Sequence, residues 1–256
     1  MDEVATLTRQ VARPLIWHDL KEPWPKALRG GTCFILRFDS GLVGVTANHV
    51  IAAFERARRQ ATEIISLLRT VRFDLAGALL DRDVELDLAT FRVTEEQLVE
   101  SGAIALDCRQ EWPPPKPDHG RELSLAGYPE AFKEALPHDR YEFRALVYIA
   151  RAEDITEQNI IATYEPTRDR RIVAAPQFPE LGANWSGCSG GPVLMHVERN
   201  GCHRSFPVGI IAEGPRFAPD GEKREFDQFI FRRIHFLNTE GRIQKASSGW
   251  LPGHQY

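Results

Sequence analysis

Residues 112–120 read Trp112-Pro113-Pro114-Pro115-Lys116-Pro117-Asp118-His119-Gly120, with four prolines in five positions. Proline has no backbone N–H to give to a sheet, so this stretch cannot be a central strand and favours a stiff, extended connector. Short segments rich in β-branched and aromatic residues lie on both sides of it, about six on each side. The connector therefore predicts a boundary between two β units.

The strands expected before the connector are residues 11–17, 32–38, 42–47, 71–75, 78–80 and 86–93. Those expected after it are residues 122–127, 141–150, 160–164, 171–174, 192–196, 208–212 and 226–232. Apolar spacing predicts a helix at residues 49–60, and Thr94 with Gln97 three residues later predicts another helix start. We expect an all-β fold of two six-stranded antiparallel β-barrels with few short helices. The N-terminal barrel spans residues 1–112, the connector 113–120, and the C-terminal barrel with a short tail 121–256.

Composition excludes several classes of protein. Of the 256 residues, 43% are apolar, which is enough for one large core or two small ones. The 32 Lys and Arg against 36 Asp and Glu give a net charge of −4, so no basic field is available for nucleic acid or for a polybasic membrane tether. No run approaches the roughly 20 apolar residues of a spanning helix, and the polar N-terminus does not resemble a secretory signal.

The four cysteines, Cys33, Cys108, Cys188 and Cys202, are scattered and form no Cys-x-x-Cys pair. This pattern argues against a disulfide framework and against a structural zinc site. We therefore expect a cytoplasmic protein with free thiols, and no nucleic-acid or membrane partner.

Residues 187–192 read Gly187-Cys188-Ser189-Gly190-Gly191-Pro192, a pattern that arises by chance in about one chain of this length in several thousand. A serine hydroxyl attacks well only when a base takes its proton and donors bind the resulting oxyanion. A tight turn can direct the N–H groups of Gly187 and Ser189 at one point, and glycines let a substrate approach closely. Ser189 is thus the candidate nucleophile, with Gly187 and Ser189 as the oxyanion hole. The alternatives are a glycine-rich turn without chemistry and Cys188 as the nucleophile.

The candidate base is His49, which ends an apolar strand and begins the predicted helix. An imidazole base needs a carboxylate that fixes its tautomer. Asp83, Glu85 and Asp87 are the candidates. Asp87 is preferred because it lies in the apolar run 86–93, where an acid needs a partner, whereas the other two lie in an acidic, turn-like segment.

The order His49, Asp87, Ser189 resembles that of the trypsin/chymotrypsin-like serine peptidase family. Three motifs carry the resemblance: Thr46-Ala47-Asn48-His49, Asp87-Leu88-Ala89 and residues 187–192. Residues 208–214 resemble the strand that pairs with substrate in that family, and Ala126-Gly127-Tyr128-Pro129 resembles an early strand of the second barrel in bacterial relatives. The resemblance spans roughly residues 11–240 and is closest to bacterial, intracellular, stand-alone members.

The resemblance implies a serine endopeptidase that hydrolyses peptide bonds through an acyl-enzyme and uses no metal or cofactor. His49 and Asp87 would come from the first barrel and Ser189 from the second. A protein or peptide would be the substrate. Counting six residues back from Ser189 places Ala183 at the base of the primary pocket, with Ala212 and Gly214 as its walls. Without an acid there, we expect cleavage after apolar or small residues. Another register would place Gly182 or Asn184 at the base, and Glu180 or Glu213 could restore a basic preference.

Two departures from the family bear on regulation. Cys188 stands where zymogen-activated members have an Asp, and Val50 stands where secreted members have a disulfide cysteine. We therefore expect activation by a partner protein, a ligand or a conformational ordering of residues 181–188. The alternative function is a catalytically silent pseudo-peptidase that acts as a protein-binding module. An esterase with the same triad is a weaker alternative, since residues 215–225 show no sign of a lipid-binding lid.

Overall fold

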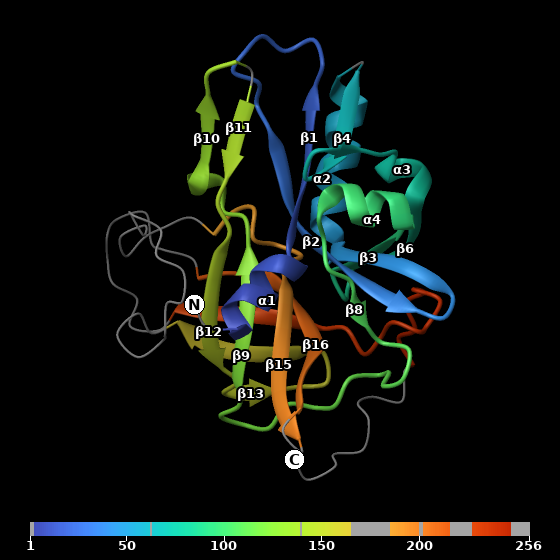
Figure 1. Cartoon of the computed structure of the whole chain (residues 1–256), viewed down its shortest axis with the longest axis vertical. Coiled ribbons are helices and arrows are strands. Elements are labelled where there is room, and N and C mark those ends of the chain that lie inside the picture. Colours follow the sequence, from blue (N-terminus) through green and yellow to red (C-terminus); the bar gives the residue numbers. More distant parts are fainter. Residues whose placement is uncertain are drawn as a thin grey trace.

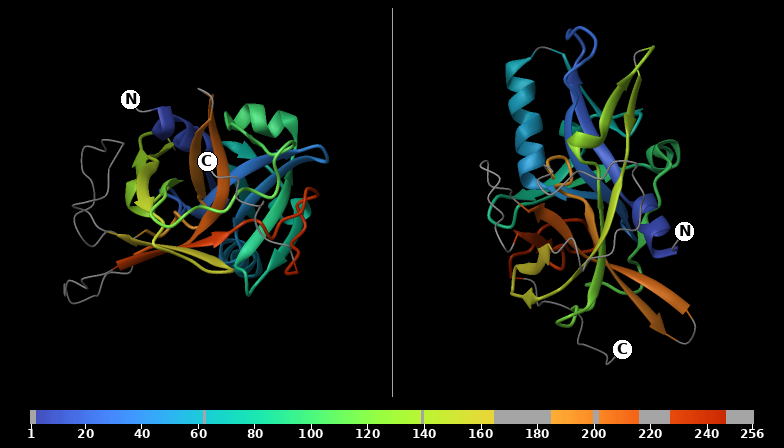
Figure 2. Two further views of the ribbon diagram at one scale, coloured as in Figure 1. Left: turned by 90° about the horizontal axis from the view of Figure 1, so that it is seen from below. Right: turned by 90° about the vertical axis from the view of Figure 1, so that its left-hand side faces the viewer.

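The computed structural model describes residues 3–61, 63–138, 140–164, 185–199, 202–215 and 227–246. These residues form a mostly β protein in which two large sheets lie against each other and a few short helices cover their edges (Figure 1). The prediction of a β protein with few helices is confirmed. Figure 2 shows the same arrangement from two further sides, with the long helix α2 (Asn48–Gln60) standing beside the first sheet.

The first sheet contains eight strands, and its hydrogen-bonded order is β5-β4-β1-β2-β3-β7-β6, with β8 added in parallel to β2. Its members are β1 (Arg13–Asp19), β2 (Arg29–Phe38), β3 (Gly41–Ala47), β4 (Ile64–Leu68), β5 (Val71–Arg72), β6 (Leu79–Asp83), β7 (Leu88–Val93) and β8 (Leu106–Asp107). Two short helices, α3 (Leu75–Ala78) and α4 (Glu95–Ser101), join its strands. The predicted start of α4 is confirmed, because the Thr94 hydroxyl accepts the N–H of Gln97 and the Gln97 side chain accepts the N–H of Thr94.

The second sheet contains seven strands in the order β12-β9-β15-β16-β17-β14-β13. They are β9 (Glu122–Gly127), β12 (Leu146–Arg151), β13 (Asp154–Ile155), β14 (Asn159–Tyr164), β15 (Pro192–Arg199), β16 (Cys202–Glu213) and β17 (Asp227–Arg233). A 3₁₀ turn at Glu130–Phe132 leads into a separate hairpin, β10 (Lys133–Leu136) and β11 (Arg140–Phe143). This hairpin rises beside the tips of β1 and β2 (Figure 1).

Two closed six-stranded barrels are not confirmed by the strand pairing. The sheets have eight and seven strands, and within the described residues the end strands of each sheet do not pair with each other. The predicted strand at residues 71–75 is reduced to β5, because the Asp74 side chain caps α3 at that point. The predicted strand at residues 141–150 divides into β11 and β12. The predicted strand at residues 171–174 lies outside the described residues.

The strands before the connector, ending with β8, belong to the first sheet, and the second sheet begins with β9 after it. The two ends of the chain do not follow this division: each packs against the sheet formed by the other half. Helix α1 (Glu3–Val11) lies on the second sheet, where the hydroxyls of Thr8 and Ser124 are 2.7 Å apart. Residues 234–243 return to the first sheet, and the Thr90 hydroxyl there donates to the carbonyl of Gly241 at 2.7 Å. The two sheets are thus held together by three separate crossings.

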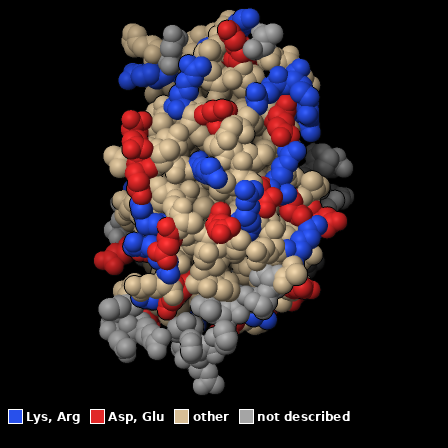
Figure 3. All heavy atoms as spheres, turned by 90° about the vertical axis from the view of Figure 1, so that its right-hand side faces the viewer, with Lys and Arg blue, Asp and Glu red and all other residues tan. Residues whose placement is uncertain are grey.

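The face shown in Figure 3 carries acidic and basic side chains of both signs intermixed, without an extended field of one sign. Among the described residues, no helix has the length and apolar character needed to cross a bilayer.

Candidate functional site

His49 lies in the first turn of α2, directly after β3, and its ring contacts the carboxylate of Asp87. The His49 Nδ1 atom is 2.8 Å from Asp87 Oδ2, and the backbone N–H of His49 donates to Asp87 Oδ1 at 2.9 Å. A carboxylate at Nδ1 keeps the proton on that nitrogen and leaves Nε2 as the basic atom. The His49 side chain is 50% exposed, so a substrate can approach the imidazole ring from solvent.

Asp87 also completes the N-terminus of α2. The first N–H groups of a helix have no acceptor inside it, and the side chain of Ala47, the cap residue, offers none. The carbonyl of Asp87 accepts the N–H of Asn48 at 3.1 Å, while its carboxylate accepts that of His49. Asp87 has a φ of +49°, a left-handed conformation that Asp tolerates better than most residues. The structure therefore places Asp87 in the turn before β7 and not inside the strand.

The two other candidate acids have a different partner. The Lys245 Nζ atom is 2.9 Å from Asp83 Oδ2 and also contacts the Glu85 carboxylate. Asp83 Oδ1 in addition accepts the N–H of Leu86 at 2.8 Å. The choice of Asp87 thus rests on its direct contact with the imidazole, while Asp83 and Glu85 bind a surface lysine.

Ser189 lies in a tight turn that requires its glycines. Gly187 and Gly190 have φ values of +93° and +83°, which residues with a side chain rarely adopt. A Cβ at Gly190 would lie 2.8 Å from the backbone nitrogen of Ala47, closer than real Cβ contacts. The turn therefore lies directly against the end of β3, where Ala47 precedes His49 by two residues.

Thr32, in β2, joins this turn to the first sheet. Its N–H donates to the carbonyl of Ser189 at 2.9 Å, and its hydroxyl donates to the carbonyl of Gly187 at 2.7 Å. The same hydroxyl accepts the N–H of Tyr128 at 3.0 Å, and the Thr32 carbonyl accepts the hydroxyl of Thr46 at 2.8 Å. Because Thr32 is fully buried, water does not compete for these bonds. Thr32 therefore fixes the spacing between the sheets at the site.

Gly31 brings the segments of the histidine and the serine into contact. A Cβ on Gly31 would lie 2.7 Å from Val50 Cγ2 and 3.1 Å from the carbonyl oxygen of Ser189. Val50 follows His49 in α2, so the backbone of Ser189 and the helix that carries the base meet at this glycine. The structure thus brings together the segments of His49, Asp87 and Ser189, which are distant in sequence.

The N–H groups of Gly187 and Ser189 are oriented through their own peptide units. The carbonyl that precedes Gly187 accepts the N–H of Glu130 at 2.8 Å, and the carbonyl that precedes Ser189 accepts the N–H of Gly191 at 2.9 Å. In a trans peptide the N–H points opposite to the carbonyl, so each bond fixes the direction of the N–H that follows. Among the described residues, neither of these two N–H groups donates a hydrogen bond. They are two oriented and unused donors beside the serine.

The rival nucleophile, Cys188, is unsuited to the role. Its side chain is buried against Gly127, and burial raises the pKa of the thiol well above its ordinary value. The thiolate is the nucleophilic form of cysteine, and a buried thiol in apolar surroundings does not form it readily.

Of the predicted pocket residues, Ala212 lies near the end of β16 and Gly214 directly follows that strand, while Ala183 lies outside the described residues. On one side, β16 pairs with β15 as far as Ile210 and then with the serine turn, since the N–H of Gly190 donates to the carbonyl of Ile211 at 2.8 Å. Ala212 is the extra residue of a bulge against β17. A Cβ at Gly214 would lie 2.6 Å from the Cβ of Trp185.

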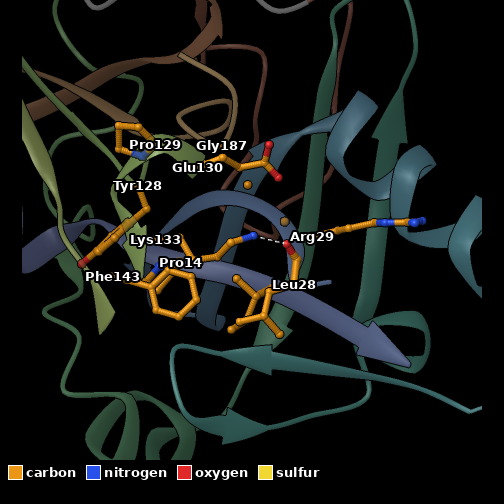
Figure 4. Close-up of a pocket in the computed structure, with 12 residues that line it drawn as sticks. Pro14, Leu28, Arg29, Tyr128, Pro129, Glu130, Lys133, Phe143 and Gly187 are labelled. Atoms are coloured by element: carbon orange, nitrogen blue, oxygen red, sulfur yellow. Dashed lines mark hydrogen bonds between the residues drawn. The ribbon is translucent and has the colours of Figure 1, made fainter. Parts of the chain in front are cut away.

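A small pocket opens next to Gly187 (Figure 4). Gly30 and Gly31 of β2 line one part of it, and Glu130 and Lys133 line another. The Lys133 ammonium donates to the carbonyl of Leu28 across this pocket, which ties the start of β10 to the first sheet.

Two residues that orient the site were missed by the sequence reasoning. Thr32 and Glu130 act through backbone and hydroxyl bonds to residues more than 50 positions away in the chain, and no local pattern marks such a contact. The only signal near either of them was the motif at residues 126–129, which ends one residue before Glu130.

The described residues contain no cluster of three or more His, Cys, Asp or Glu side chains that could hold a metal ion. Comparison with protein-family models and with curated proteins finds no match for this chain.

Proposed function

We propose that this chain is a serine endopeptidase in which Ser189, His49 and Asp87 form the catalytic triad. The observation that carries the proposal is the 2.8 Å contact between His49 Nδ1 and Asp87 Oδ2, made beside a serine turn held by Thr32. A histidine fixed by a carboxylate, on a segment that packs against a serine turn with two oriented N–H groups, is an arrangement suited to acyl transfer.

In the proposed reaction, the Ser189 hydroxyl attacks the carbonyl carbon of a peptide bond while His49 Nε2 accepts its proton. The Asp87 carboxylate stabilises the imidazolium and keeps the ring in place. The oxyanion is bound by the N–H groups of Gly187 and Ser189. The imidazolium then gives its proton to the leaving amine, and an acyl-enzyme remains. Water, deprotonated by His49, attacks the ester and releases the second product and Ser189.

The substrate would bind along the end of β16. On one edge of β16, β15 pairs as far as Ile210 and the serine turn pairs with Ile211. Ala212 and Gly214 follow these residues, where that pairing has ended. An extended peptide adds to such an edge through main-chain hydrogen bonds. Ala183, Ala212 and Gly214 would then form the primary pocket, which suits an apolar or small side chain.

The family that this function suggests is that of the trypsin-like peptidases, and the two sheets would be its two barrels with additional edge strands. Cys33, Cys108 and Cys188 are free, buried thiols, and burial raises the pKa of both Cys33 and Cys108 to about 12. Free thiols of this kind suit a reducing compartment, and we place the activity in the cytoplasm of a bacterial cell.

A cytoplasmic endopeptidase without an ion-pair zymogen switch must be restrained in another way. We propose that its basal activity is low and that a partner protein or ligand raises it by ordering residues 181–188. High activity of the purified protein alone against unstructured casein would contradict this regulation.

The proposed activity is tested with a fluorescent fluorophosphonate probe and with labelled casein. Wild-type protein should react covalently with the probe, and Ser189→Ala should not. Cys188→Ala is the matched control and should keep the labelling, because the neighbouring thiol takes no part. Equal labelling of wild type and Ser189→Ala would show that Ser189 is not the nucleophile. No labelling of either protein would show that the chain is a binding module and not a peptidase.

A further inference from the structure

A groove of about 640 Å³ is lined by residues of β1, of β4 and the turn after it, of the loop before β2 and of the β10–β11 hairpin. This hairpin stands at the end of the molecule, beside the tips of β1 and β2 (Figure 1). Its volume falls within the roughly 300–1,000 Å³ of ligand pockets. Three aromatic side chains line it, Trp24, Tyr141 and Phe143. The Trp24 and Tyr141 rings pack with their centroids 4.6 Å apart, and Trp24 remains 38% exposed, which is high for so large an apolar side chain.

The groove is also positively charged. Lys26, Arg69 and Arg140 line it together with His18, and none of the described residues that line it is acidic. Among the described residues, these three cations form no ion pair, unlike Arg37, Arg109 and Arg144 elsewhere on the surface. The Lys26 ammonium donates to the carbonyl of Leu20 at 2.9 Å, which holds the charge in place without neutralising it.

This groove adjoins the pocket beside the serine turn. Ile16, Leu28 and Phe143 line both of them, and the smaller pocket reaches Gly187 (Figure 4). The Tyr141 hydroxyl donates to the carbonyl of Lys26, so the hairpin and the loop before β2 form one wall. The groove therefore lies on the same side of the molecule as the pocket that borders the serine turn.

We propose that the groove binds an acidic polypeptide segment that also carries a large apolar side chain. Carboxylates would pair with Lys26 and Arg140 at the rim, and the apolar side chain would pack against Trp24 and Phe143. That this segment belongs to the substrate rests on the proposed peptidase function. The binding itself does not.

A single-stranded nucleic acid is the other polyanion that a groove of aromatic and basic residues can bind. The structure favours the peptide. Trp24 and Tyr141 pack against each other, so their facing surfaces are not free to stack bases.

The test measures binding to the Ser189→Ala protein, so that no hydrolysis is needed. A fluorescein-labelled 12-residue peptide of Asp, Glu, Phe and Leu is titrated and followed by fluorescence anisotropy. We expect saturable binding that weakens at least tenfold in Lys26→Gln/Arg140→Gln and in Trp24→Ala, while Trp24→Phe retains most of it. The matched control is Arg59→Gln/Lys116→Gln, which removes two exposed charges outside the groove and should bind like the parent. Equal melting temperatures show that the variants fold.

Three results would overturn the proposal: equal binding by the groove variants and the parent, equal binding of a peptide with Asn and Gln in place of the acids, or tighter groove binding of oligothymidylate. In active protein, the same segment attached to a cleavable peptide should lower KM, and the groove variants should remove that gain without changing kcat. Binding by a protein whose Ser189 also fails to react with the fluorophosphonate probe would refute the peptidase function and leave the groove assignment standing.

Discussion

The backbone N–H of Glu130 donates a 2.8 Å hydrogen bond to the carbonyl oxygen of Ser186. This bond turns the peptide between Ser186 and Gly187 so that the N–H of Gly187 faces away from Glu130. If the peptide between Ser186 and Gly187 turned over, its carbonyl oxygen would take the place of the Gly187 N–H. That oxygen would repel an oxyanion instead of binding it. The proposed catalysis therefore depends on the loop between β9 and β10 as well as on the triad.

We expect Ser189→Ala, His49→Ala and Asp87→Asn each to lower turnover by about 10⁴-fold, and the double variants to lose little more because the three residues act as a unit. Steady-state cleavage of a peptide substrate measures this. Asp83→Asn is the control and should keep near-normal turnover, since Asp83 binds Lys245 and not His49. Loss of activity in Asp83→Asn with retention in Asp87→Asn would reverse the assignment of the acid.

Thr32→Val should lower kcat by about 100-fold with a smaller change in KM, because displacement of the serine turn by a fraction of an ångström misplaces the nucleophile. It should also cost about 1–3 kcal/mol of unfolding free energy, because buried partners lose their hydrogen bonds.

The matched control for Thr32 is Thr90→Val. Thr90 is equally buried, and its hydroxyl donates to the Gly241 carbonyl at 2.7 Å, away from the serine. Thr90→Val should lose about as much unfolding free energy as Thr32→Val, and its kcat should equal that of the wild type. Equal kcat losses in the two variants would mean that Thr32 acts only through stability.

Stability should fall in acid because of His235. Burial and the nearby guanidinium of Arg233 lower the pKa of His235 to about 3, against 6.5 for an unfolded histidine. Above pH 6.5 the ring is neutral in both states. Between pH 6.5 and about 3 the unfolded chain binds a proton that the folded chain does not, so unfolding free energy should fall by up to about 1.4 kcal/mol per pH unit. Urea unfolding at several pH values measures this slope. His235→Gln should flatten it, and the exposed His203→Gln should leave it unchanged.

Cleavage should occur after apolar or small residues, because an Arg or Lys side chain buried against Ala183, Ala212 and Gly214 would have no countercharge. A peptide-library digest with mass-spectrometric readout identifies the residue before each cut. Dominant cleavage after Arg or Lys would show that the pocket base is not Ala183, or that Glu180 or Glu213 supplies the charge.

The parts of the fold that sequence predicted are those with local signals. The capping box at Thr94 and the helix after His49 are confirmed because caps and apolar spacing act within a few residues. Helix α1 was not predicted, since its buried face consists of Ala5, Thr8 and Val11, which give no strong apolar pattern. Ala5 and Thr8 are buried because the second sheet, more than 100 positions later, lies against them.

The same distinction applies to the site. His49, Asp87 and Ser189 could be proposed because their side chains carry chemistry and their neighbours form short motifs. Thr32 could not, because a threonine in a strand is ordinary, and its role depends on which carbonyls it meets after folding. The strand count also exceeded the prediction, because two-residue strands such as β8 and β13 follow from pairing with a neighbour and leave no pattern of their own.

Helix α1, the connector and residues 234–243 each pass from one sheet to the other. Neither half of the chain is therefore a separate folding unit: the first sheet buries a segment from the C-terminal half, and the second is covered by a helix from the N-terminal end. Heat or denaturant should melt the two sheets in a single cooperative transition. A cut in the connector alone would leave the halves interlocked, with the histidine and the serine still facing the same junction.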